Sequence, residues 1–283
     1  MQDFQFYTPN SIEEALNFLS EKASACKTIA GGTDLIPSLR KEEIRPAHVM
    51  NILEIKELKG IREEEDCIRI GPAATFTEIT NHQIVKGFLP LLAEAASWVG
   101  GPTIRNRGTI GGNICTASPA ADVLPAVLAL EGLLELRSKT AGTRLLPTAE
   151  AIEGPYQTRL RPDELLTGIL IRKLAPGARH AYEKLARRHA MARAYMSLTV
   201  ILVLDGNGAI SDLRIVPGAV EAVARRIGAA EEILLGKRPK EPLVREAAEA
   251  LIGDLSGVWI PDYKLPVLKN VFKRVLIRAL NHE

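Results

Sequence analysis

Cysteine is scarce in this chain, and the three that occur, Cys26, Cys67 and Cys115, are far apart in the sequence. An odd, unclustered set of this kind argues against a disulfide framework and against a cysteine-ligated metal or iron–sulfur centre. The five histidines are equally scattered. We therefore expect no metal site in this chain and a reducing compartment.

Long apolar runs and an excess of one charge are also absent. The longest apolar candidate, residues 198–204, is too short to cross a bilayer. The N-terminal sequence MQDFQFY lacks the basic-then-apolar order of a secretory signal. A net charge of +2 gives no reason to expect nucleic acid or an anionic membrane as a partner. These absences predict a cytoplasmic protein with no membrane insertion.

The familiar catalytic motifs are missing as well. Residues 108–112 (GTIGG) have the wrong spacing for G-x-G-x-x-G, and a Walker A sequence, H-E-x-x-H and G-x-S-x-G do not occur. We assign no catalytic residue, because no nucleophile or acid–base pair stands out. If the protein is an enzyme, its reactive centre is expected to be a bound cofactor.

Two glycine pairs are the informative feature that is present. The first lies in residues 30–35 (AGGTDL), and the second begins the glycine- and hydroxyl-rich stretch 109–122, expected to be a loop. Glycine lets a backbone approach a ligand closely, and successive N–H groups can then point into one concavity. Two such loops predict a clamp for an anion such as a diphosphate.

The order of expected elements predicts an α+β protein with more than one domain, since 283 residues exceed the usual size of one. Residues 1–57 alternate strand and helix and form a small subdomain. Residues 58–175 form a second subdomain, whose helix at 89–99 precedes the glycine-rich stretch. The break at Ala175-Pro176-Gly177 predicts a boundary, after which residues 178–283 contain a hairpin around the turn 205–208 and then helices.

Together the two glycine stretches and Asp122 resemble the FAD-binding, medium subunit of the xanthine dehydrogenase and carbon monoxide dehydrogenase family. The resemblance spans nearly the whole chain and includes Tyr182-x-Lys184-x-x-x-Arg188. It implies a two-subdomain FAD-binding domain of the PCMH type at 1–175. A smaller C-terminal flavoprotein domain, an antiparallel sheet with a helical bundle, would follow at 178–283.

The resemblance also implies where a non-covalent FAD binds. Its diphosphate would lie between the two glycine stretches, Val99 and Leu166 would pack on the flavin or adenine, and Asp122 would meet polar groups beyond the phosphates. Lys184 would place a positive charge near the isoalloxazine. The expected cofactor-binding residues are Ile29, Ala30, Gly31, Gly32, Thr33, Asp34, Leu35, Val99, Thr109, Ile110, Gly111, Gly112, Asn113, Asp122, Leu166 and Lys184. We expect valine at Gly32 or Gly111 to leave a folded protein that lacks the cofactor.

By the same resemblance, the chain is the electron-transfer subunit of a molybdenum hydroxylase or dehydrogenase. Molybdopterin would be held by a large partner subunit and a two-iron, two-sulfur cluster by a small one, with electrons passing through FAD to NAD or another acceptor. The family's Asp after the arginine pair is missing from residues 187–193 (RRHAMAR), which leaves the acceptor open. Two alternatives remain: a stand-alone FAD-dependent oxidoreductase, and an assembly subunit without flavin.

Overall fold

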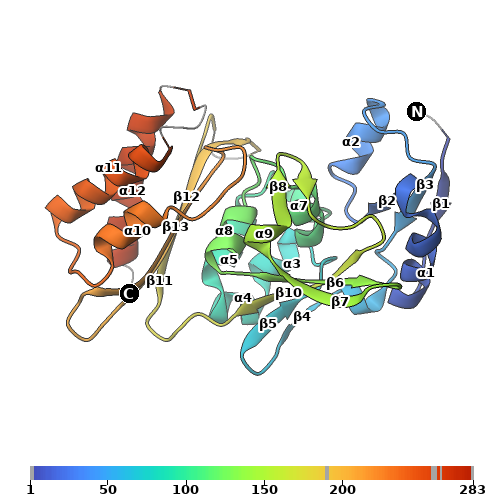
Figure 1. Ribbon diagram of the computed structural model, residues 1–283, viewed down its shortest axis with the longest axis horizontal. Helices are drawn as coiled ribbons and strands as arrows, with labels where there is room; N and C mark the ends of the chain where they lie inside the picture. The colour runs from blue at the N-terminus through green and yellow to red at the C-terminus, as the bar shows by residue number, and fades with distance from the viewer. Residues whose placement is uncertain (1–2, 189–190, 256–259, 262, 282–283) are drawn as a thin grey trace.

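The computed structural model describes residues 3–188, 191–255, 260–261 and 263–281. Figure 1 shows three units side by side in chain order: a small N-terminal unit, a central unit, and a C-terminal sheet covered by helices. Each unit is built on its own sheet, and a two-stranded ribbon, β8 (Ile152–Gly154) with β9 (Gln157–Thr158), accompanies the central one.

The N-terminal unit is a three-stranded parallel sheet in the order β1-β3-β2. Its elements are β1 (Gln5–Tyr7), α1 (Ile12–Lys22), η1 (Ala23–Ala25), β2 (Cys26–Ile29), α2 (Leu35–Arg40), β3 (His48–Asn51) and η2 (Lys56–Leu58). Ser11 caps α1 by accepting from the N–H of Glu14, which satisfies one of the unpaired donors at the helix start. The turn between β2 and α2 carries the first glycine pair.

The central unit is a five-stranded antiparallel sheet in the order β4-β5-β10-β6-β7. Its strands are β4 (Ile61–Glu63), β5 (Cys67–Ile70), β6 (Leu133–Ser138), β7 (Gly142–Pro147) and β10 (Leu165–Arg172). Its helices are α3 (Phe76–Asn81), α4 (Gln83–Phe88), α5 (Pro90–Ser97), α6 (Pro102–Arg105), α7 (Ile110–Thr116), α8 (Leu124–Ala129) and α9 (Thr148–Ala151). Although β10 is the middle strand, residues 165–166 at its start pair with β6 alone, and residues 169–170 pair on both sides.

The C-terminal unit is a three-stranded antiparallel sheet, β11 (Arg179–Ala186), β12 (Ala194–Leu204) and β13 (Ile210–Gly218). The helices α10 (Gly228–Leu234), α11 (Glu241–Leu255) and α12 (Lys264–Leu280) cover one face of this sheet. The opposite face packs against α5 and α8 of the central unit, as Figure 1 shows. One apolar core therefore continues across the junction and includes Tyr182, Ile201 and Val216 of the C-terminal sheet.

The predicted α+β class and the C-terminal antiparallel sheet are confirmed. The turn at 205–208 does join two antiparallel strands, and the Asp205 carboxylate accepts from the N–H groups of Asn207 and Ala209 inside it. Among the described residues no helix has the length and apolar character that a membrane crossing requires.

Candidate functional site

A cavity of about 750 Å³ lies between the N-terminal and central units. That volume is within the range of pockets that hold a large organic ligand. Its walls come from β2 and the turn after it, from α7, and from the segment 156–166 that leads into β10. Thirteen of the sixteen predicted cofactor-binding residues line it: Ile29, Ala30, Gly31, Gly32, Thr33, Asp34, Leu35, Val99, Thr109, Gly111, Gly112, Asn113 and Leu166.

The first glycine stretch supplies free backbone donors to this cavity. Within the described chain, the N–H groups of the four residues from Gly31 to Asp34 have no hydrogen-bond partner. Gly32 has a φ of 72°, the left-handed conformation that lets successive N–H groups turn toward one side. An anion lying in the cavity could satisfy several of these donors at once.

The second glycine stretch differs from the prediction of a loop, because Ile110–Thr116 is helix α7. Thr109 caps it by accepting from the N–H of Gly112, and the buried Ile110 and Ile114 anchor it in the core. Tertiary packing has thus overridden the low helix propensity of the two glycines. The N–H groups of Ile110 and Gly111 donate to the carbonyls of Ala74 and Pro72, so they are not available to a ligand.

The glycines serve two different purposes. A Cβ at Gly31 would lie 1.9 Å from the Arg107 carbonyl oxygen, and one at Gly111 would lie 2.6 Å from Pro72 Cβ. Both glycines therefore let two backbone segments touch. A Cβ at Gly112 would have only Thr109 Oγ1 within 4 Å, at 3.1 Å, so this glycine alone of the three keeps ligand space open.

These contacts correct the expectation that valine at Gly32 or Gly111 leaves a folded protein. At Gly111 the added carbons would collide with the Pro72 backbone. At Gly32 a Cβ would face a left-handed φ and lie 3.2 Å from Ile36 Cγ1. Both substitutions would disturb the fold as well as the cavity.

Two polar side chains of α7 face the region between the glycine stretches. Asn113 Oδ1 is buried and has no hydrogen-bond partner among the described residues, although a buried acceptor ordinarily has one. Thr116 Oγ1 donates to Asp34 Oδ2 at 3.3 Å and so ties α7 to the first glycine stretch. The orphaned amide oxygen, the free N–H groups and the open space at Gly112 together fit a ligand with both phosphate acceptors and donor groups.

Val99 and Leu166 also line the cavity, and their packing on the flavin or adenine stays a prediction. The carbonyls of Val99 and of the residues on either side of it are held by cations. Lys184 Nζ donates to the Trp98 oxygen at 3.0 Å, and Arg105 Nη1 donates to the oxygens of Val99 and Gly100. Arg105 belongs to the central unit and Lys184 to the C-terminal sheet, so this part of the wall is fixed from two units.

The remaining predicted residues lie behind the wall. Ile110 is fully buried, and Asp122 and Lys184 form a buried ion pair with 2.7 Å between Oδ2 and Nζ. Burial raises the pKa of Asp122, and the Lys184 ammonium opposes that rise. Since none of the three lines the cavity, a direct contact of any of them with a cofactor stays a prediction.

Several cavity residues were missed by the sequence analysis. Among them are Cys26, Phe76, Ile104, Cys115, Tyr156 and Glu164. Phe76, Tyr156 and Glu164 belong to segments with no glycine motif, and only the fold brings them to the cavity. Cys115, three residues after Gly112, could have been found by extending the second motif. Cys115 is an exposed residue that lines the cavity, and desolvation by the protein atoms around its thiol raises the pKa to about 12.

Of the two carboxylates that line the cavity in the described part of the chain, Glu164 is the one that an arginine holds. Arg144 reaches it with two hydrogen bonds of 2.7 and 2.9 Å, and the N–H of Arg161 adds a third of 2.7 Å. Burial works to raise the pKa of Glu164, but these donors outweigh it and hold the pKa below the ordinary 4.5. The carboxylate is therefore a structural anchor for the start of β10 and is not free to act as a base.

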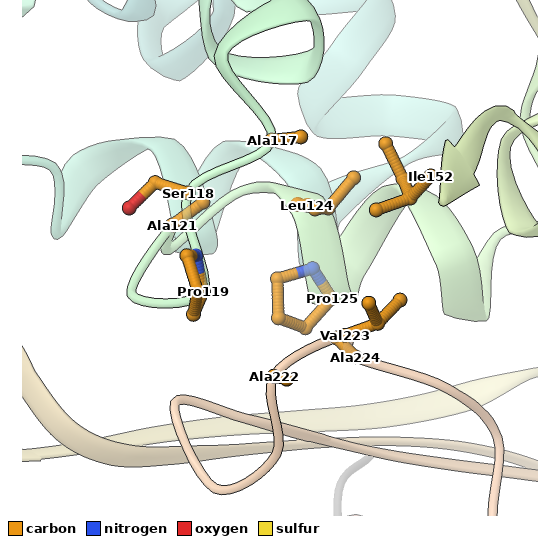
Figure 2. A pocket seen from close by; sticks show the side chains of 10 residues that line it. All are labelled: Ala117, Ser118, Pro119, Ala121, Leu124, Pro125, Ile152, Ala222, Val223 and Ala224. Carbon is orange, nitrogen blue, oxygen red and sulfur yellow. The ribbon is translucent and has the colours of Figure 1, made fainter. Parts of the chain in front are cut away.

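A second, much smaller recess lies where the segment 117–125 meets the segment 222–224 of the C-terminal unit, as Figure 2 shows. Alanine and proline side chains line most of it, and it has no room for a water molecule. The backbone N–H of Ala219 donates to the Pro119 carbonyl beside it. The recess is a packing feature of the junction.

No cluster of potential metal ligands occurs among the described residues.

The chain matches two known family descriptions in sequence. Residues 2–173 match the FAD binding domain in molybdopterin dehydrogenase, and residues 180–279 match the CO dehydrogenase flavoprotein C-terminal domain.

Characterised relatives are similar over almost their full length. The nicotinate dehydrogenase FAD-subunit of Eubacterium barkeri is 33% identical, with 99% of this chain and 97% of the relative covered. The carbon monoxide dehydrogenase medium chain of Hydrogenophaga pseudoflava is 34% identical, with 98% and 96% covered. Among solved structures, a chain of reconstituted CO dehydrogenase from Oligotropha carboxidovorans superimposes with a TM-score of 0.93 at 26% identity, covering 100% of this chain and 99% of that one.

Proposed function

The chain belongs to the family of FAD-binding subunits of molybdopterin dehydrogenases, and we propose that its 750 Å³ cavity holds that FAD and relays electrons within a larger complex. FAD supplies a two-electron redox centre that can also exchange single electrons. The protein contributes the binding, the orientation and the electrostatic surroundings.

One observation carries this assignment: residues 31–34, whose N–H groups have no partner, and Asn113, whose buried Oδ1 has none, line one cavity. The N–H groups would hold the diphosphate, with the Thr33 hydroxyl as a further donor. Asn113 Oδ1 would accept from a donor group of the cofactor. Val99 and Leu166 would cover apolar ring surface of the cofactor.

Partner subunits would supply the remaining redox centres. Relatives of this chain are described as medium chains or FAD-subunits of dehydrogenases, names that place each of them beside other subunits. We therefore assign molybdopterin to a large partner and the two-iron, two-sulfur cluster to a small one. Electrons would travel from substrate through those centres to FAD, then to NAD or another acceptor.

Purification of a tagged copy of the chain from the organism that produces it tests this assignment. The account predicts that molybdenum, iron and FAD co-purify in a constant ratio, and that substrate bleaches the flavin only in the complex. The stand-alone oxidoreductase alternative predicts instead that the pure single chain turns over a substrate by itself. If the chain is an assembly subunit, the partner subunits co-purify with it and no flavin does.

A further inference from the structure

The tip of the β8–β9 hairpin carries a residue that its backbone geometry does not favour. The hairpin turns through Pro155 and Tyr156, and Tyr156 has a φ of 60°, in the left-handed region. When a turn has proline at its first central position and a positive φ at its second, glycine or asparagine ordinarily occupies the second. Among the described non-glycine residues with a positive φ, Tyr156 is the only aromatic one. The chain therefore bears a backbone strain here that glycine would remove.

This tip lies where the two glycine stretches come together. The Tyr156 N–H donates to the carbonyl of Ala117, the C-cap of α7, at 2.9 Å. One residue before that cap, Thr116 donates to Asp34 of the first glycine stretch. β9 packs against α7, and Figure 1 shows the hairpin beside that helix. Tyr156 lines the cavity together with Thr158 of β9, so a hydrogen bond to α7 fixes the tyrosine at the cavity wall.

Packing within the protein does not account for the ring of this tyrosine. Tyr156 is 63% exposed and belongs to none of the three apolar clusters that the described residues form. It is thus neither a core residue nor a favoured turn residue. Strained positions of this kind cluster at ligand sites, where the surrounding structure holds a side chain in place for a ligand. An aromatic ring in the wall of a cavity can stack on a flat heterocycle, whatever the heterocycle's hydrogen-bonding pattern.

We propose that the Tyr156 ring covers the cavity and packs on a flat ring system of the bound dinucleotide, adenine or isoalloxazine, and so slows release of the cofactor. The inference rests on the proposed function, because it requires FAD in the cavity. The hydrogen bond to Ala117 ties Tyr156 to the helix that carries Gly112 and Asn113. The stacking surface and the polar contacts of the second glycine stretch therefore keep a fixed spacing.

Release of FAD from the loaded full chain tests the proposal. Tyr156→Phe keeps the ring, whereas Tyr156→Gly removes the ring and at the same time relieves the strained φ. The matched control is Phe6→Ala, which removes a ring that is 59% exposed on β1, a strand none of whose described residues lines the cavity. The loaded protein is diluted, and the flavin released with time is separated by rapid filtration and quantified. The midpoint of thermal unfolding is measured for each chain without FAD.

We expect Tyr156→Gly to release FAD roughly fivefold faster than the parent or more, because stacking on the aromatic side chain is lost. Its thermal midpoint without FAD should equal or exceed that of the parent, because glycine accepts the positive φ. A purely structural role of the tyrosine would change stability and leave the release rate as it is. Tyr156→Phe and Phe6→Ala should release FAD at the parent rate. The proposal is overturned if Tyr156→Gly releases FAD at the parent rate, or if Tyr156→Phe releases it as fast as Tyr156→Gly.

The fluorescence of the bound flavin tells which ring system Tyr156 covers. Tyrosine in contact with an isoalloxazine quenches its fluorescence by electron transfer, and phenylalanine does not. Brighter bound flavin in Tyr156→Phe would place the side chain on the isoalloxazine, and unchanged emission would place it on the adenine; both results support the proposal. A parent chain that binds no FAD would refute the proposed function too, whereas FAD release that does not depend on residue 156 would refute only this inference.

Discussion

Lys184 Nζ lies 2.7 Å from Asp122 Oδ2 and 3.0 Å from the Trp98 carbonyl oxygen, so one ammonium joins three segments of the chain. The pair is buried, with side-chain exposures of 3% and 9%. Buried pairs of this kind stabilise little in themselves, but removing one partner leaves an uncompensated charge. The residue pair therefore holds the C-terminal sheet to the wall of the cavity that carries Val99.

We predict that Lys184→Met lowers the free energy of unfolding by about 3–5 kcal/mol at neutral pH, the usual cost of breaking a buried pair. Without the ammonium, burial raises the pKa of Asp122 further above its value in the unfolded chain. The folded variant then holds a proton that the unfolded chain releases, so its deficit should grow as the pH rises. Urea unfolding at pH 5.5 and pH 8 measures this, with the exposed Lys86→Met as control. Equal deficits at both pH values would contradict it.

The two helical glycines should respond differently to substitution. Gly112→Val places its side chain in open cavity space, and we expect a folded protein whose FAD content drops at least tenfold. In Gly111→Ala the added methyl group would collide with the Pro72 backbone. We therefore expect a lower midpoint of thermal unfolding, and loss of cofactor as a consequence of that destabilisation. Thermal unfolding and flavin content, measured together, separate the two effects. Full flavin content in Gly112→Val would show that the ligand lies elsewhere.

Much of this fold could be predicted from the sequence, because the hairpin turn at 205–208 and the apolar stripe of α12 are local signals. The first glycine stretch lines the cavity, and its contact with a cofactor stays a prediction. The helical state of residues 110–116 could not be predicted, since it depends on the burial of Ile110 and Ile114 against distant segments. The sequence motif also did not reveal that Gly31 and Gly111 let backbone segments touch, because those contacts join segments far apart in the sequence.

Stability in acid should depend on Glu164. Because Arg144 and the Arg161 N–H hold the pKa of Glu164 below 4.5, its contribution is present above about pH 4.5. The stabilisation by Glu164 is lost as the pH falls from 4.5 through the lowered pKa that Glu164 has in the folded protein. Glu164→Gln should cost about 2 kcal/mol at pH 7, the range for hydrogen bonds to a charged group, and less at pH 3.5. Chemical denaturation at the two pH values checks this, and a constant deficit would refute it.

The cysteines report on occupancy of the cavity. Cys26 and Cys115 line it, whereas Cys67 lies outside on β5. We predict that added FAD slows alkylation of Cys26 and Cys115 by iodoacetamide several-fold and leaves Cys67 unchanged. Peptide mass spectrometry gives the three rates separately, and uniform protection would point to a global change.

The most direct test of the central claim is the flavin content of the purified chain. The protein is passed through gel filtration, denatured by heat, and its released flavin is identified by chromatography and quantified against the protein. We expect non-covalent FAD, which heat alone releases, at close to one molecule per chain. A colourless protein that also fails to bind added FAD would contradict the assignment of the cavity between the N-terminal and central units.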